Sequence, residues 1–239
     1  MDSKKKQRVD WFEDVESPAQ SKVTPPSAPK IRVIKLVRKA KQTAGHYINC
    51  TTSQEDWGKR RDLTPFCLGP CHLYGDHVSQ TVENAWQFSK VYDEHIGEDG
   101  LPTADYFEWA KKGWSSMNTE RHPMGKETKA KFHWWDGRKL TRVEARKAIY
   151  VPLYVEQVTR FGNRTFEGLT KLWALMTGSK SGAIYLMDYD AYDYSHMTLT
   201  DVLNNEAKSM GHGFVIAMLL LNDPALKQCQ LRPGTSTRP

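Results

Sequence analysis

Short strand-like segments are scattered among longer helical ones along this chain, and this alternation limits the folds open to it. A strand is predicted at 45–52, a strand-and-turn region with Gly and Pro at 63–80, and a buried strand beginning at 182. Helices are predicted over 79–95, 100–114, 141–161, 164–178, 198–205 and 209–223. Because helices outnumber strands, we expect an α+β, mostly helical single domain with a small sheet.

Composition divides the chain of 239 residues into three regions. Residues 1–44 are expected to form a basic tail containing Pro and Ser, with too few large apolar residues to order itself. The folded domain is expected over 45–228, followed by a C-terminal tail at 229–239. Within the first tail, residues 31–41 alternate apolar and basic side chains, which is typical either of a first strand or of an element that orders on a partner.

The positive charge is concentrated at the amino-terminal end. The formal net charge is +6, and residues 1–41 hold eleven Lys or Arg against five Asp or Glu. The remaining chain is balanced. A basic arm attracts polyanions by counterion release, so DNA contact through this tail is one interpretation. A solubilising tail is the other.

The cysteine spacing and the length of the apolar runs indicate whether the chain can bind a metal or cross a membrane. Of four Cys, only Cys67 and Cys71 form a closely spaced pair, and a structural zinc site usually needs two such pairs. We therefore expect neither a metal nor another cofactor. No secretory leader is recognised, and no apolar run reaches about 18 residues, which predicts no membrane span. A cytoplasmic protein with reduced thiols is expected.

The first predicted helix has a polar stripe. With Ser79 as its N-cap, Glu83, Gln87, Lys90 and Glu94 fall at i, i+4, i+7 and i+11, which places them on one helical face. A carboxylate and a lysine in one pocket shift each other's pKa. The alternative is an ordinary solvated face, the usual fate of such stripes.

Three other stretches contain side chains suited to chemistry. A basic and aromatic loop follows Met124 and Gly125, and it carries Lys126, Lys129, Lys131, Phe132, Trp134, Trp135, Arg138 and Lys139. Cations fit phosphates and flat rings fit bases, although the Trp residues could equally be core anchors.

The acidic turn after the strand beginning at 182 contains Asp188, Asp190 and Asp193, which could act as an acid or base or form a solvated turn. The closing helix starts with Gly211 and His212, and glycines at a helix start allow the approach of a phosphate.

These stretches, in this order, resemble the NADAR family over about residues 65–223. Glu83, Gln87 and Lys90 match that family's Glu, Gln and Lys, and Asn84 stands where His is usual.

The later motifs continue the resemblance. Met124 and Gly125 match the start of a Met-Gly-Arg motif, Lys126 replaces its Arg, and Trp135 or Trp134 fills a Trp position. Residues 145–154 resemble the family's next helix.

The last two motifs lie near the C-terminal end. Asp190 or Asp193 falls in the family's acidic loop, and Gly211 with His212 opens its closing helix.

The resemblance implies a NADAR-like fold and N-glycosidase chemistry, with no metal required. Members of the family cleave bonds between ribose C1 and nitrogen, including that of ADP-ribose attached to guanine in DNA, and some act as antitoxins. By this analogy Glu83 and Asp190 (or Asp193) serve as acid, base or charge stabiliser, and Lys90 holds a phosphate or forms a Schiff base.

The analogy also suggests a set of substrate-binding residues. They are Asn84, Gln87, Met124, Gly125, Lys126, Trp134, Trp135, Gly211 and His212. The expected partner is an ADP-ribosylated nucleic acid or nucleotide. Two alternatives stay open: a nucleic-acid-binding or DNA-modification accessory protein without hydrolysis, and an N-glycosidase acting on small ribosyl nucleotides.

Overall fold

The computed structural model describes residues 31–37, 41, 44–52, 63–160, 169, 172–174, 176 and 183–231. Helices and small sheets together build this part of the chain, in agreement with the expected α+β class. The first 30 residues and most of the helix expected at 164–178 lie outside the described residues. No described helix has both the length and the apolar character that crossing a membrane requires.

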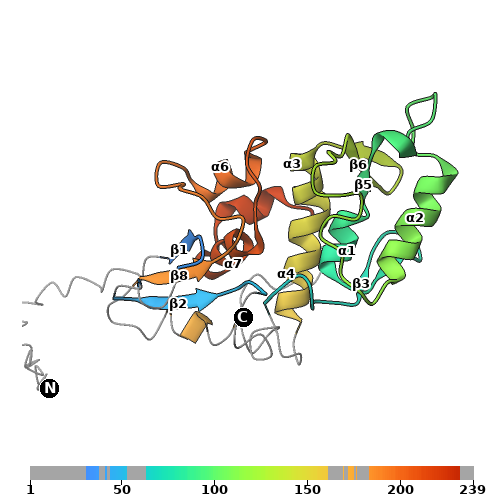
Figure 1. Cartoon of the computed structure of the whole chain (residues 1–239). Coiled ribbons are helices and arrows are strands. Elements are labelled where there is room, and N and C mark those ends of the chain that lie inside the picture. The colour runs from blue at the N-terminus through green and yellow to red at the C-terminus, as the bar shows by residue number, and fades with distance from the viewer. Residues whose placement is uncertain are drawn as a thin grey trace, which may run out of the picture.

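A three-stranded parallel sheet forms one side of the molecule (Figure 1). Its order is β1 (Ile31–Ile34), β8 (Ile184–Met187) and β2 (His46–Asn49), and Ile184 pairs with both Ile31 and His46. The central strand β8 is the most apolar of the three, as a strand covered by neighbours requires.

Strand β1 corrects the expected tail boundary. It falls within residues 1–44, yet Ile31 and Val33 are buried and the strand pairs with β8 along its whole length. Of the two interpretations of this segment, the structure shows the first strand. The boundary at residue 44 therefore lies too late.

Helix α7 (His212–Leu221) packs against this sheet, and α6 (Leu199–Asn204) and the 3-10 helix η5 (Pro224–Gln228) pack beside it. Nine of the ten residues of α7 are buried. A helix that is apolar all round must be enclosed by other elements, which explains its position in the interior.

A long composite helix runs between the sheet and the rest of the molecule (Figure 1). It begins as α3 (Arg142–Ala145), passes through a π-helical turn (Arg146–Tyr150) and continues as α4 (Val151–Thr159). The Val151 N–H bonds to the carbonyl of Arg146, five residues back. The sequence predicts a kink or a break at Pro152. The helix is not broken there, because it continues through Pro152 as α4. The wider π-helical turn lies directly before Pro152, where the missing Pro N–H interrupts regular α-helical hydrogen bonding.

The remaining elements lie on the other side of this helix. They are β3 (Cys71–His72), β4 (Val78–Ser79), α1 (Val82–Gln87), β5 (Lys90–Val91), the 3-10 helix η3 (Asp93–His95), α2 (Ala104–Ser115), β6 (Phe132–Trp135) and β7 (Arg138–Leu140). Strands β3 and β4 pair antiparallel, as do β5, β6 and β7. The described residues thus form three small sheets, where one was expected.

The helix predicted at 79–95 is much shorter than its pattern suggested. Helix α1 starts after Thr81, whose side chain accepts a hydrogen bond from the Asn84 N–H, so Ser79 is not the cap. The chain then turns at Phe88 and enters β5. The sequence also predicts Thr103 as the cap of the helix at 100–114, and this is confirmed, because the Thr103 side chain accepts a hydrogen bond from the Tyr106 N–H at the start of α2.

A hairpin replaces part of the predicted basic and aromatic loop. Asp136 and Gly137 both have positive φ between β6 and β7. This is the backbone of a two-residue type I′ turn, for which Asp-Gly is a favoured sequence.

Candidate active site

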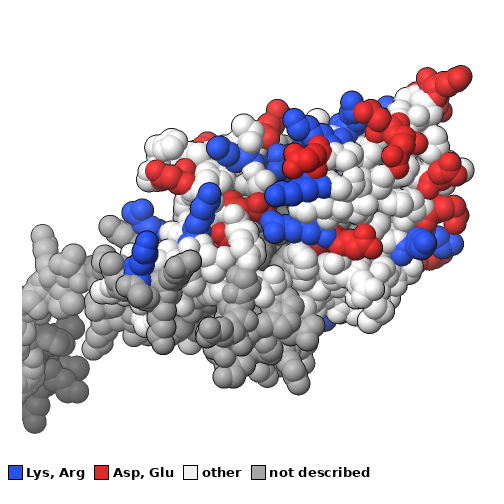
Figure 2. Space-filling view, viewed as in Figure 1, with Lys and Arg blue, Asp and Glu red and all other residues white. Residues whose placement is uncertain are grey.

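A cavity of about 490 Å³ opens between the two sides of the molecule. It is lined by Glu83, Trp86, Gln87, Lys90, Tyr92, Arg121, His122, Gly125, Lys126, Thr128, Lys129, Ala130, Lys131, Phe132, His133, Arg142, Arg146, Tyr150, Asp190, Ser209 and Met210. Seven of these residues are Lys or Arg and two are Asp or Glu. Figure 2 shows Lys and Arg gathered over the middle of the visible face, with acidic residues among them.

Helix α1 positions the first carboxylate of the cavity. Besides the Thr81 cap, the free N–H groups at its start bond to the preceding loop: Val82 to the Leu68 carbonyl and Glu83 to the Pro65 carbonyl. These bonds satisfy the unpaired donors of the first turn and fix a helix of only six residues. Glu83 is consequently held at the cavity wall with 6% exposure.

Glu83, Gln87 and Lys90 form one hydrogen-bonded chain. The Gln87 Nε2 donates to Glu83 Oε1 at 2.8 Å, and Lys90 Nζ donates to Gln87 Oε1 at 2.5 Å. The amide of Gln87 thus joins a carboxylate to an ammonium group and has its orientation fixed by both. The sequence placed these three residues on one helical face. The structure brings them together although Lys90 belongs to β5, and Glu94, with 64% of its side chain exposed, lies outside the cavity lining.

Burial shifts the pKa of both Glu83 and Lys90, the two ionisable groups that Gln87 joins. Desolvation raises the pKa of Glu83, although the hydrogen bond from Gln87 and the charge of Lys90 oppose this shift. Desolvation lowers the pKa of Lys90 to about 8, with the nearby Glu83 acting in the opposite direction. Such opposed shifts in one cleft are typical of catalytic groups.

Three aromatic rings, those of Trp86, His133 and Tyr150, pack together beside the hydrogen-bonded residues Glu83, Gln87 and Lys90. The ring of Trp86 lies 4.3 Å from that of His133 and 5.3 Å from that of Tyr150, measured between centroids. The Nδ1 of His133 contacts the Ser89 hydroxyl at 2.9 Å, and burial keeps the pKa of His133 well below its usual value. Trp86 is half-buried and lines the cavity, so part of its ring is accessible to a ligand.

Asp190 is the second carboxylate of the cavity. Burial raises its pKa, and the neighbouring charge of Asp188 adds to the shift. Its Oδ2 lies 3.7 Å from the guanidinium of Arg121. Asp193, the alternative match, is exposed, and its Oδ1 accepts a hydrogen bond from the Ser195 N–H. Asp190, and not Asp193, therefore shares the cavity with Glu83.

Arg146 places an almost fully buried positive charge at the cavity. Its guanidinium donates to the carbonyls of Leu203, Asn205 and Lys208, and none of these acceptors carries a charge. Burial lowers the pKa of Arg146 to about 10, so the group stays charged at neutral pH. This cation fixes the loop after α6 and adds to the positive field that an anionic ligand would meet.

Asn84, expected to bind substrate, has a structural role here. It is fully buried, and its Nδ2 donates to the carbonyls of Ser116 and Asn118 while its Oδ1 accepts from the Glu120 N–H. It is not among the residues lining the cavity. Its three bonds instead position the segment that leads into Arg121.

The two predicted Trp residues also lie away from the cavity. Trp135 is buried against Tyr74, and Trp134 packs edge-on to Phe107. Trp86 stands at the cavity in their place. Gly125 and Lys126 line the cavity as expected, whereas Met124 does not; its carbonyl accepts from the Thr128 hydroxyl.

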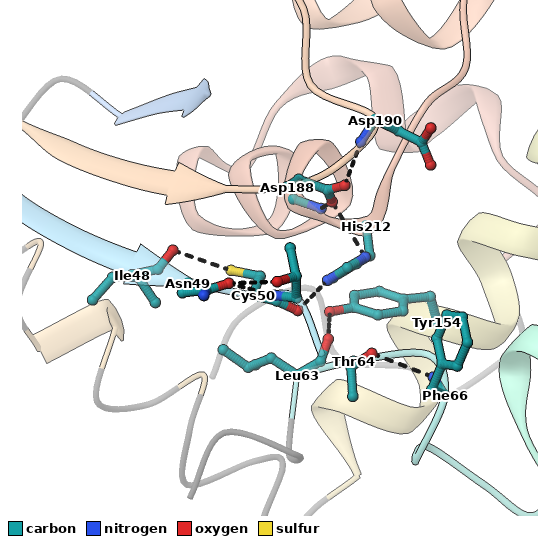
Figure 3. A network of polar contacts seen from close by, with 12 residues as sticks. Ile48, Asn49, Cys50, Leu63, Thr64, Phe66, Tyr154, Asp188, Asp190 and His212 are labelled. Carbon is teal, nitrogen blue, oxygen red and sulfur yellow. Dashed lines mark hydrogen bonds and ion pairs between the residues drawn. The ribbon is translucent and has the colours of Figure 1, made fainter. Parts of the chain in front are cut away.

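The start of α7 is occupied by a side chain of the protein itself (Figure 3). Asp188 Oδ2 accepts from the Gly213 N–H at 2.8 Å and lies 3.2 Å from His212 Nδ1, while His212 Nε2 contacts the Cys50 carbonyl at 2.6 Å. A side chain at Gly211 would collide with Asp188. Glycine therefore admits the Asp188 carboxylate, and the predicted phosphate site at Gly211 and His212 is wrong.

The other places that could hold a ligand are less suited to chemistry. No group of three or more His, Cys, Asp or Glu in the described ranges is arranged to hold a metal ion. A larger cavity of about 680 Å³ lies along β1 and residues 192–197, and its lining is mainly apolar. The smaller cavity has the convergent charged groups that a reaction centre needs, so it is the candidate active site.

Sequence reasoning missed several residues of this site. They are Trp86, Arg121, His133, Arg142, Arg146 and Tyr150. Two of these residues had an available signal. Trp86 lies one helical turn after Glu83, and the Asp136-Gly137 turn predicts a hairpin whose first strand contains His133. The other residues meet through long-range packing.

Comparisons with models of protein families, with curated proteins and with solved structures found no significant match for this chain. The resemblance to the NADAR family therefore rests on the quoted motifs and their order. The charged groups that converge in the cavity are an observation independent of these motifs.

Proposed function

We propose that this protein is an N-glycosidase that removes ADP-ribose from a modified nucleobase, with guanine in DNA as the expected substrate and reversal of toxin-type ADP-ribosylation as its role. The observation that carries the proposal is the chain Glu83–Gln87–Lys90 in the wall of a strongly cationic cavity. The family resemblance supports the choice of ADP-ribose.

The charges of the cavity suit such a substrate. A diphosphate would be attracted by the surplus of Lys and Arg, and the ring face of Trp86 would support a base or ribose. A cationic cavity alone opposes the positive charge that develops at ribose C1 as its bond to nitrogen breaks. A carboxylate beside C1 is therefore required, and Glu83 and Asp190 are the two that line the cavity.

The reaction needs one water molecule. The C1–N bond breaks with its electron pair going to the base, which takes up a proton, and the hydroxyl of water adds to C1. One of Glu83 and Asp190 stabilises C1 or activates water, while the other protonates the leaving base; the raised pKa of each suits proton transfer.

Lys90 offers a second route. With a pKa of about 8, roughly a tenth of its side chains are neutral amines at pH 7. A neutral amine can attack C1 and displace the base, which leaves with the electron pair of the C1–N bond and takes up a proton. The ribose ring then opens to give a Schiff base, and water hydrolyses this imine to release the sugar and restore the amine.

The test is to incubate the purified protein with three substrates and analyse the products by mass spectrometry. The substrates are duplex DNA carrying ADP-ribosylated guanine, the corresponding free nucleotide, and small ribosyl phosphates with an N-linked base. Release of ADP-ribose from DNA supports the proposal. Cleavage of small ribosyl phosphates alone would favour a metabolic N-glycosidase, and DNA binding without cleavage would favour an accessory protein.

A further inference from the structure

Arg121 is a lining residue of the cavity, and its side chain has few contacts. Its guanidinium lies 3.7 Å from Asp190 Oδ2 and 5.5 Å from the ring centroid of Tyr189. The side chains of Arg121 and Asp190 are 44% and 40% exposed. An ion pair so exposed contributes little to stability, so a competing anion can displace it readily.

The backbone that carries Arg121 is, in contrast, firmly fixed. Asn84 makes three hydrogen bonds to residues 116–120, and the Thr119 hydroxyl donates to the Phe66 carbonyl at 3.0 Å. The guanidinium can therefore change partners by rotating its side chain while the loop stays in place. Asn84 acts as a positioning residue for Arg121.

We infer that Arg121 is a phosphate-binding residue that the free protein holds on Asp190 and Tyr189 until an anionic ligand replaces them. Binding of the anion then separates Arg121 from Asp190. The Asp190 carboxylate, whose oxygens point away from Asp188 in Figure 3, becomes available to the ligand's sugar at the same moment. This inference takes from the proposed function only that the ligand carries phosphate.

If Arg121 leaves Asp190 to bind the anion, the effects of mutating these two residues on anion affinity should be coupled. Simple electrostatic attraction between the cavity and the anion does not predict such coupling. Replacing Asp190 by Asn frees Arg121, so an anion should bind more tightly, although Asp190 is itself a candidate catalytic group. If Asp190 merely repelled anions through its charge, the same gain would persist after Arg121 is removed. A double-mutant cycle separates the two causes because it isolates the coupling between the residues.

The experiment is calorimetric titration of the full chain with inorganic pyrophosphate. Four proteins are compared: the wild type, Arg121→Gln, Asp190→Asn and the double variant. We expect Arg121→Gln to weaken binding about tenfold or more, as the loss of a charge-assisted hydrogen bond does. Asp190→Asn should tighten binding several-fold in the wild-type background and have little effect in the Arg121→Gln background.

Arg160→Gln is the matched control, because the Arg160 side chain is 43% exposed and forms an ion pair with Glu156 at 3.2 Å, but does not line the cavity. Its affinity for pyrophosphate should equal that of the wild type. Equal tightening by Asp190→Asn in both backgrounds, unchanged affinity of Arg121→Gln, or absence of pyrophosphate binding by the wild type would each overturn the inference. Coupling without glycosidase activity would retain the inference and reject the proposed function.

Discussion

At the scale of single residues, the most informative group is Lys90, because the burial that lowers its pKa also affects the stability of the fold. Its pKa of about 8 in the folded protein is below the ordinary lysine value of 10.5. Below pH 8 the folded state must keep a desolvated charge that the unfolded chain carries in water. The protonated lysine therefore costs stability at neutral pH.

This shift predicts how Lys90→Met changes the free energy of unfolding. Between about pH 8 and 10.5 the unfolded wild type binds more protons than the folded one, so wild-type stability rises with pH in this window. We expect the variant to be more stable than the wild type at pH 7, with the gap shrinking by roughly 2–3 kcal/mol towards pH 10.5. Urea denaturation of both proteins at several pH values measures it. A gap that does not depend on pH would contradict the assigned environment of Lys90.

At the scale of elements, the packing of α2 against the turn after α1 depends on Gly113. The sequence predicts this glycine near the helix end, and it lies in the last turn of α2, where it faces the buried ring of Phe88. A Cβ atom at this position would collide with the ring. Close packing, and not helix termination, therefore explains this glycine.

Gly113→Ala should consequently destabilise the protein, although Ala is the better helix former by about 1 kcal/mol. We expect a net loss of about 1–2 kcal/mol, because overpacking in the core outweighs the gain in propensity. Thermal and urea unfolding measure the change. Phe88→Leu in the same background should recover part of the loss, and Lys112→Ala on the exposed face should change stability by less than about 0.5 kcal/mol.

Several helices and strands could be predicted from the sequence. The buried strand β8, the Thr103 cap and the apolar α7 follow from composition and local signals, and these are seen. The spacing of Glu83, Gln87 and Lys90 correctly grouped three residues. It also included Glu94, because a helical period cannot reveal that α1 ends at Gln87 and that β5 replaces its continuation.

The pairing of distant residues could not be predicted in this way. Asn84 bonds to residues 32 to 36 positions later, and Arg146 to carbonyls almost 60 positions later. These hydrogen bonds depend on tertiary packing, which leaves no periodic trace in the chain. For the same reason the sequence placed Asp188 in an acidic turn and gave no sign that it caps α7.

At the scale of the whole molecule, the positive charge is distributed differently from the expected basic tail. Residues 1–30 hold six Lys or Arg and five Asp or Glu, whereas residues 31–41 hold five Lys or Arg and no acid. The charge excess thus begins at β1, which belongs to the sheet. A truncation that tests the tail must therefore end at residue 30, so that β1 is kept.

Removing residues 1–30 lowers the net charge by only one unit, so we expect little change in the salt dependence of duplex DNA binding. Lys126→Gln with Lys129→Gln, at the cavity, should reduce the slope of log K against log salt by nearly one for each phosphate that these lysines neutralise. Fluorescence anisotropy at several salt concentrations gives both slopes. A large decrease after truncation alone would assign DNA binding to the tail.

The measurement that tests the central claim most directly is the intact mass of an oligonucleotide carrying ADP-ribosylated guanine, before and after incubation with wild-type protein, Glu83→Gln or Glu94→Gln. Glu83→Gln keeps an oxygen that can accept from Gln87 but removes the ionisable carboxyl group, whereas Glu94 is an exposed member of the same sequence stripe. We expect the wild type and Glu94→Gln to restore the unmodified mass and Glu83→Gln to leave the modification in place. An unchanged mass with the wild type, or full removal by Glu83→Gln, would contradict the account.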